Sequence, residues 1–172
     1  ITEAFCGYVT PLYINDISLP TAYIGRISLV YNLCIVYISG TFLIKLIKKI
    51  KSRLIQNILH ILLVSIGLFI CAYIKGFYGV LIAAMILGSA DGFGFSVQST
   101  YILETKAAKK IGNSRMLTYF SLFKKFGVML GPTVFSIFMV NGIQGLGLMG
   151  IILMICAAVC FIVILILQKP NL

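Results

Sequence analysis

The sequence is dominated by apolar runs that are far longer than a β-strand, and several are long enough to cross a bilayer. A spanning helix needs about 20 mostly apolar residues, and the runs lack the period-two alternation of a barrel strand. The sequence therefore predicts an all-α integral membrane protein with six transmembrane helices. We expect these helices at 1–14, 23–44, 54–73, 80–103, 116–140 and 146–167, the first one truncated because the chain starts inside an apolar run.

Composition agrees with a membrane location and narrows the class of partner. Hydrophobic residues make up 60% of the chain and charged residues 10%, and the mean hydropathy is +1.09, which excludes a soluble domain of this length. The net charge of +10 could suggest nucleic acid, but the basic residues lie between the apolar runs, where topology signals occur. We expect the lipid bilayer as a partner and no nucleic acid. The five cysteines lack metal-ligand spacing, so we interpret them as packing residues and expect neither a metal nor a cofactor.

Basic residues alternate between the two sides of the predicted bundle. Two loops and the tail at Lys169 carry most of them, whereas the opposite turns offer Arg26 and Lys75. The positive-inside rule places the first set in the cytoplasm. This predicts a multi-pass protein of the cell membrane with Leu172 on the cytoplasmic side. The marker residues are Lys45, Lys48, Lys49, Lys51 and Arg53 in the first loop and Lys106, Lys109, Lys110 and Arg115 in the second.

Two acidic residues lie inside predicted spans. Asp91 is about twelve residues, or roughly 18 Å, from each flanking turn, which places it near the bilayer midplane. Gln98 follows at i+7 on the same helix face, and Glu3 lies about eleven residues, or roughly 16 Å, from Ile14. A carboxylate in hydrocarbon costs at least a few kcal/mol, so such a residue is by default a hypothesis about function.

Two interpretations of these carboxyl groups are open. Burial disfavours the charged form of a carboxyl, so Asp91, Glu3 and Gln98 are candidates for proton coupling or for binding a cationic or hydroxylated substrate. The alternative is a structural hydrogen bond or an ion pair, for example with Arg26. On the neighbouring face of the Asp91 helix, the small residues Gly88, Gly92 and Ser96 are spaced for helix packing.

Other motifs predict packing and anchoring. Gly127 and Gly131 permit close helix approach, and Pro132 removes a backbone hydrogen bond, which predicts a kinked, closely packed helix. Lys124 and Lys125 are expected to anchor this helix at the interface, and His60 is interpreted as an interfacial histidine. The run 145–150 matches G-x-G-x-x-G but lacks a preceding strand, so it is interpreted as packing.

The segment 112–132, with Gly127, Gly131 and Pro132, resembles the eleventh helix of a major facilitator superfamily transporter, and the basic run 40–53 is similar to a degenerate loop signature of that family. The resemblance implies that the chain is a carboxy-terminal six-helix half. It also implies that the helices carrying Glu3 and Asp91 line a central cavity, and that the missing amino-terminal half of the same chain is a partner. Members of the family work by rocking two halves about a midplane site.

The functional hypothesis is secondary active transport of a small molecule by alternating access, coupled to protons, with export or antiport favoured. The alternative is a transporter-like membrane region that senses or anchors in a signalling protein. We expect no enzymatic activity, because the sequence pairs no serine or cysteine nucleophile with a base and contains no phosphate loop.

Overall fold

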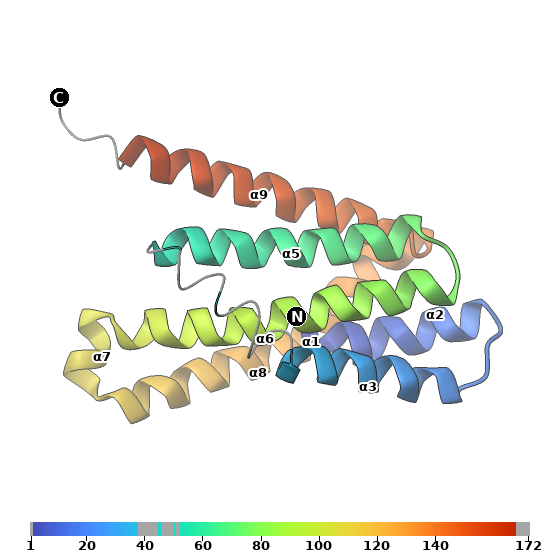
Figure 1. The fold of residues 1–172 in the computed structure, drawn as a ribbon, viewed down its shortest axis with the longest axis horizontal. Coiled ribbons are helices and arrows are strands. Elements are labelled where there is room, and N and C mark those ends of the chain that lie inside the picture. Colours follow the sequence, from blue (N-terminus) through green and yellow to red (C-terminus); the bar gives the residue numbers. More distant parts are fainter. Residues whose placement is uncertain (1, 38–44, 46–49, 51, 168–172) are drawn as a thin grey trace.

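The computed structural model describes residues 2–37, 45, 50 and 52–167, and these form helices joined by short connections with no β-strand among them (Figure 1). The all-α prediction is therefore confirmed for the described residues. In chain order the helices are α1 (Thr2–Ala4), the π-helical η1 (Phe5–Val9), α2 (Thr10–Asp16), α3 (Ala22–Tyr37), α5 (Arg53–Tyr73), α6 (Phe77–Leu103), α7 (Lys106–Ile111), α8 (Asn113–Phe138), the 3₁₀-helical η3 (Met139–Asn141) and α9 (Gly145–Leu167).

Each of the six predicted ranges overlaps a helical stretch, with differences at the boundaries. The second predicted helix is α3, and its remaining part, 38–44, lies outside the described residues. The fifth begins three residues earlier than expected, at Asn113, because the preceding loop forms the unpredicted helix α7. Thr105 caps the start of α7, because its hydroxyl accepts a hydrogen bond from the Ala108 N–H at 3.3 Å. Gly112 ends α7 at a φ of +96°.

The first helix is not a regular α-helix. It runs from Thr2 to Asp16 but widens into a π-helical segment between Phe5 and Val9. Pro11 lacks an N–H, and a proline ring clashes with the carbonyl group of the preceding helical turn. The Thr10 N–H and the Thr10 hydroxyl both donate to the Phe5 carbonyl oxygen, which makes the turn wider than in an α-helix. The wider turn thus pairs the Phe5 carbonyl with Thr10, the residue before the proline.

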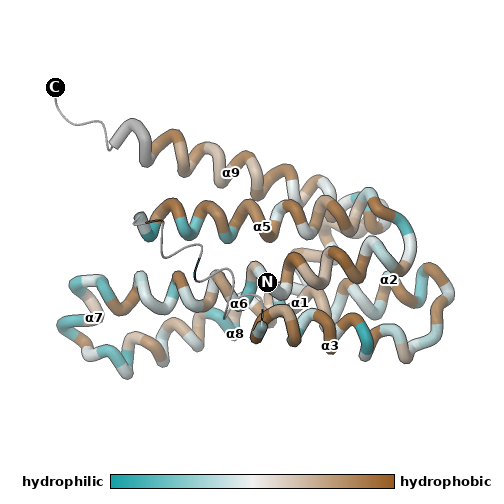
Figure 2. Tube along the Cα trace, viewed as in Figure 1, coloured by the Kyte–Doolittle hydropathy of each residue, from teal (hydrophilic) through white to brown (hydrophobic). Residues whose placement is uncertain are grey.

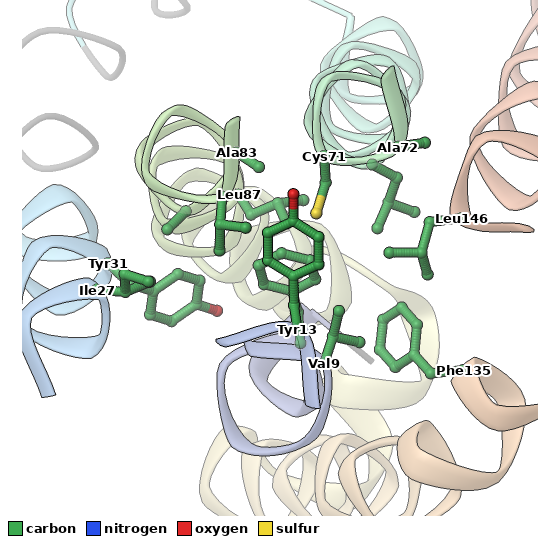
Figure 3. Packing of buried hydrophobic residues seen from close by; sticks show 14 of the residues in the cluster. Val9, Tyr13, Ile27, Tyr31, Cys71, Ala72, Ala83, Leu87, Phe135 and Leu146 are labelled. Carbon is green, nitrogen blue, oxygen red and sulfur yellow. The ribbon is translucent and has the colours of Figure 1, made fainter. Parts of the chain in front are cut away.

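This first helix lies at the centre of the hydrophobic core. Figure 3 shows Val9 and Tyr13 pointing into the space between α5 and α6, with Phe135 and Leu146 beside them. The Tyr13 hydroxyl also accepts a hydrogen bond from the Gly76 N–H at 2.7 Å, which ties the first helix to the turn before α6. Phe135 of α8 meets Phe5 edge to face at a centroid distance of 6.4 Å.

Small residues determine how closely the outer helices approach. A Cβ atom at Gly88 of α6 would overlap the Tyr31 main chain of α3, so this part of the predicted packing stripe does bring two helices together. A Cβ at Gly150 of α9 would lie 3.0 Å from the Ser65 carbonyl oxygen of α5. The glycines of the run 145–150 therefore lie in a helix interface and not in a nucleotide loop.

The connections lie at two opposite ends of the bundle. Figure 1 shows α7 at one end, and the α2 to α3, α5 to α6 and α8 to α9 connections at the other. At the α7 end the Arg53 guanidinium and the Glu104 carboxylate lie 2.9 Å apart and join the start of α5 to the end of α6. Hydrophilic residues gather at α7, whereas α9 is hydrophobic over most of its length (Figure 2).

Three of the described helices are long and apolar enough to cross a membrane: Arg53–Tyr73, Phe77–Leu103 and Gly145–Val163. The sequence predicted six such helices. The first stretch is divided by its π segment, α3 is described only to Tyr37, and α8 carries Lys124 and Lys125 within its length. For the first stretch, α3 and α8, a membrane-spanning position therefore stays a prediction.

Candidate functional site

Asp91 lies near the middle of α6, 14 residues after Phe77 and 12 before Leu103. Its side chain is buried, with 8% of the residue exposed. The Thr2 hydroxyl donates to Oδ1 at 2.8 Å, and the Tyr31 hydroxyl donates to Oδ2 at 3.2 Å. Both carboxylate oxygens therefore accept a hydrogen bond, which offsets part of the cost of burying the charge and connects α1, α3 and α6 at one point.

Glu3 forms an ion pair with Lys124. Glu3 Oε1 of α1 and Lys124 Nζ of α8 are 2.8 Å apart, and the side chains are 33% and 29% exposed. The expected anchoring of α8 by Lys124 at the interface stays a prediction, and the structure adds that its ammonium group turns toward Glu3 where α1 packs against α8. The suggested partner of Glu3, Arg26, instead lies over the Tyr23 ring at 5.0 Å from the centroid.

Lys124 also lies on an aromatic surface. Its Nζ is 5.0 Å from the centroid of the Phe95 ring, within the range of a cation–π interaction. Phe95 of α6 and Phe120 of α8 are 5.9 Å apart with ring planes inclined by 34°. The ammonium group is thus held by a carboxylate and by a ring face, and a second ring extends the aromatic surface.

These groups line one partly open cavity of about 370 Å³ between α1, η1, α5, α6, α8 and α9. All three predicted site residues, Glu3, Asp91 and Gln98, contribute to its wall. The structure therefore brings them together, although Glu3 and Asp91 are 88 positions apart in the sequence (91 minus 3). The remaining lining residues are Thr2, Phe5, His60, Ile61, Val64, Leu68, Leu87, Gly94, Phe95, Phe120, Lys124, Gly127, Phe135, Met149 and Leu153.

A second pocket of about 350 Å³ adjoins the first and is more open. Both pockets share Glu3, Asp91, Phe95 and Lys124, so the ion pair forms part of the boundary between them. The second pocket is completed by Ile35, Gly92 and Ser96. Gly92 and Ser96, predicted to pack against a helix together with Gly88, therefore also line a pocket.

His60 lines the cavity, and its interpretation as an interfacial histidine stays a prediction. Its Nδ1 lies 2.9 Å from the Ala90 carbonyl oxygen, one residue before Asp91. A carbonyl oxygen only accepts, so Nδ1 carries the hydrogen, and in a neutral imidazole Nε2 is then the acceptor. The ring also meets Phe93 edge to face at 6.4 Å between centroids.

The sequence did not predict that His60 and Lys124 line the cavity, although the spacing of residues after His60 indicated its position. Val64, Leu68 and Cys71 are buried, and they follow His60 at intervals of four, four and three residues. This spacing places His60 on the buried face of α5. Nothing in the sequence indicated that Lys124 would face Glu3, because that contact depends on the packing of α1 on α8.

The motif of α8 is partly visible in the structure. Gly127 lines the cavity and Gly131 is buried, and α8 continues as one helix through Pro132 to Phe138. The predicted packing and gating role of these three residues stays a prediction.

The basic residues that were predicted as topology markers lie near the helix ends where the structure describes them. Arg53 starts α5, Arg115 lies in the first turn of α8, and α7 carries Lys106, Lys109 and Lys110. Lys45 is exposed, and Lys48, Lys49 and Lys51 lie outside the described residues.

The described part of the chain contains no group of three His, Cys, Asp or Glu side chains that could hold a metal ion. Its cysteines are free thiols: Cys34 and Cys71 are buried, as packing residues would be, whereas Cys156 and Cys160 are exposed on α9. The cavity chemistry therefore depends on carboxylate, ammonium, imidazole, hydroxyl and aromatic groups.

The described fold and site define a helical protein with apolar helices suited to a bilayer and a charged group of side chains in its interior. Comparison of the chain with protein-family models, curated proteins and solved structures finds no match.

Proposed function

We propose that this chain is one half of a secondary active transporter that moves a small molecule across a membrane by alternating access, coupled to protons. One observation carries the proposal: carboxyl groups of α1 and α6 and an ammonium group of α8 line a single cavity inside a bundle of apolar helices. An ionisable group inside a membrane helix is by default a hypothesis about a substrate or ion pathway.

The membrane part of the proposal is supported by three described helices that are long and apolar enough to span a bilayer. Polar and basic residues lie at the bundle ends, and α7, which carries Lys106, Lys109 and Lys110, lies at the end where Arg53 begins α5. We propose that all six helical stretches cross the cell membrane and that the α7 end faces the cytoplasm, in accordance with the positive-inside rule.

The cavity has the size and chemistry of a small-molecule site. Its volume of about 370 Å³ lies near the lower end of the range of about 300 to 1,000 Å³ for ligand pockets. Apolar side chains such as Leu68, Leu87 and Leu153 form most of the wall, and a few polar groups converge on it. This combination suits a compact organic molecule with one polar or charged end.

Asp91 is the proposed coupling group. As an ionised carboxylate it accepts hydrogen bonds from Thr2 and Tyr31 at the same time. When it takes up a proton, one of its oxygens becomes a donor, so one of the two hydroxyls has to rotate or leave. Protonation would therefore reverse or break one of the two hydrogen bonds that connect α6 to α1 and α3, which gives a proton a way to change the contacts between these helices.

The resemblance of 112–132 to a major facilitator superfamily helix fits this proposal. In that architecture two six-helix halves rock about a midplane site, and this chain would supply one half. We propose antiport or export as the mode.

The test is proton movement in proteoliposomes that hold the full-length protein. A pH-sensitive dye trapped inside reports proton flux under an imposed pH gradient, with and without a panel of small organic solutes outside. We expect Asp91→Asn to abolish solute-driven proton flux, whereas Asp16→Asn, at the exposed end of α2, keeps it. Solute-driven flux that is unchanged in a well-folded Asp91→Asn protein would overturn the coupling role. Flux absent from the wild type for every solute would favour a sensor or anchor.

A further inference from the structure

We propose that the Lys124 ammonium group occupies the substrate site, and that the substrate is an organic ammonium ion with an aromatic or alkyl tail that replaces Lys124 between Glu3 and Phe95. This inference rests on the proposed function, since it names the substrate class of the same cavity. The contacts of Lys124 indicate that the cavity can bind an ammonium group.

The contacts of Lys124 are those of a bound ammonium ligand. Its Nζ is 2.8 Å from a carboxylate oxygen of Glu3 and 5.0 Å from the Phe95 ring centroid. A carboxylate gives a charge-assisted hydrogen bond, and a ring face attracts a cation through its quadrupole. Phe120, 5.9 Å from Phe95, would cover a tail attached to the nitrogen.

The charge of the cavity favours a cation over an anion. Its wall contains two carboxyl groups, Glu3 and Asp91, and one ammonium group, Lys124. With Lys124 paired to Glu3, the remaining charge is the Asp91 carboxylate. If Lys124 leaves the cavity, two carboxylates remain, so an entering ammonium ion restores the balance, whereas an anion would meet like charge.

Lys124 is able to leave without a large change in the fold. Its side chain is a flexible chain of four methylene groups, it is 29% exposed, and it also borders the second pocket. The entering ammonium ion would take over the pairing with Glu3, so the Glu3 carboxylate would keep a cation beside it when Lys124 leaves. After release, Lys124 would return to Glu3, and the empty cavity would not hold a second unpaired carboxylate.

Equilibrium binding to the purified full-length protein tests this proposal. The probe is radiolabelled phenethylammonium, with 2-phenylethanol and 3-phenylpropionate as neutral and anionic competitors of similar shape. We expect Lys124→Met, which keeps the length of the side chain and removes the charge, to bind phenethylammonium at least about tenfold more tightly than the wild type. Lys124→Arg keeps a cation beside Glu3 and should bind like the wild type.

Removal of the carboxylate should have the opposite effect. Glu3→Gln in the Lys124→Met background should lose the gain in affinity. In the wild type and in Lys124→Met, neither 2-phenylethanol nor 3-phenylpropionate should displace phenethylammonium. Lys124→Gln provides a second neutral variant if Lys124→Met does not fold, as judged by size-exclusion elution. Equal affinity of the wild type and both neutral variants would overturn the proposal. So would Lys124-dependent binding of 3-phenylpropionate, which would make Lys124 the anchor for an anion.

The binding assay separates this inference from the proposed function. Tight binding of phenethylammonium without any proton-coupled flux would leave the ammonium site standing and remove the transport role. Proton-coupled flux of another solute, without a gain in ammonium binding by Lys124→Met, would leave transport standing and remove the ammonium site.

Discussion

Gly94 of α6 leaves open the space that the His60 imidazole of α5 occupies. A Cβ atom at Gly94 would overlap the ring near Nδ1 and Cε1 and would lie 2.8 Å from Nε2. Without that Cβ the ring lies close to the α6 main chain, where Nδ1 donates to the Ala90 carbonyl oxygen. A glycine thus fixes the position of a titratable group in the cavity wall, one turn along α6 from Asp91.

Gly94→Ala should therefore destabilise the protein through His60. Overpacking costs about 1 to 3 kcal/mol, whereas alanine in a helix interior is favoured over glycine by about 1 kcal/mol. We expect a net loss of about 1 kcal/mol in the wild type and a gain of up to about 1 kcal/mol in the His60→Ala background. The free energies of unfolding of the four proteins form a double-mutant cycle. Additive effects would show that Gly94 and His60 do not interact.

Gly88→Ala should be more damaging than Gly94→Ala, because the obstacle is main chain and not a side chain. A Cβ at Gly88 would overlap the Tyr31 carbonyl group, so α3 and α6 would have to separate. We expect a loss of about 3 kcal/mol in the free energy of unfolding. Gly25→Ala in α3 is the matched control: it has open space around it and should stabilise by about 0.5 to 1 kcal/mol. Similar unfolding midpoints for the two variants would contradict this packing.

Much of the fold follows from the sequence, because apolar runs of helical length specify helices wherever they occur. The position of Asp91 near the middle of its helix followed in the same way from its distance to the helix ends. The partners of these residues did not follow. Periodicity predicts which face of a helix is buried but not which helix covers it, so the pairing of Glu3 with Lys124 was missed.

The π-helical segment and α7 were also beyond the sequence reasoning, for different reasons. A proline such as Pro11 is compatible with a helix that bends, breaks or widens, and the structure shows that the Phe5 carbonyl accepts from Thr10 in a widened turn. Helix α7 is six residues long, and such a short helix depends on its Thr105 cap more than on any periodic pattern.

The Tyr31 hydroxyl helps to hold the buried Asp91 side chain in place. Tyr31→Phe removes the donor to Oδ2 and leaves that oxygen without its 3.2 Å partner. We expect a loss of about 2 kcal/mol, since a hydrogen bond to a charged group contributes about 1.5 to 3 kcal/mol. Thermal unfolding of the purified protein measures the loss. Tyr23→Phe, whose ring packs on Phe77, is the control and should unfold within about 1 °C of the wild type. An equal shift in both variants would assign the loss to general packing.

The ion pair of Arg53 and Glu104 should contribute little to stability, although its 2.9 Å geometry is good. Its side chains are 39% and 52% exposed, and exposed pairs contribute about 0 to 1 kcal/mol. We expect Glu104→Gln to change the free energy of unfolding by less than about 1 kcal/mol. The charge-swapped double variant Arg53→Glu with Glu104→Arg should unfold like the wild type. A loss of several kcal/mol in Glu104→Gln would mean that the pair holds the α7 end of the bundle together.

The two ends of the bundle should face opposite sides of the membrane. Lys75 lies in the connection before α6, and Lys109 lies in α7 after α6, so a spanning α6 separates them by the bilayer. We expect a membrane-impermeant maleimide to label Lys109→Cys only from the cytoplasmic side and Lys75→Cys only from the opposite side, as the positive-inside rule requires. The background carries Cys156→Ala and Cys160→Ala, since these two thiols are exposed, and the background protein without an introduced cysteine is the control. Labelling of both positions from one side would show that α6 does not span, and it would remove the membrane basis of the transport proposal.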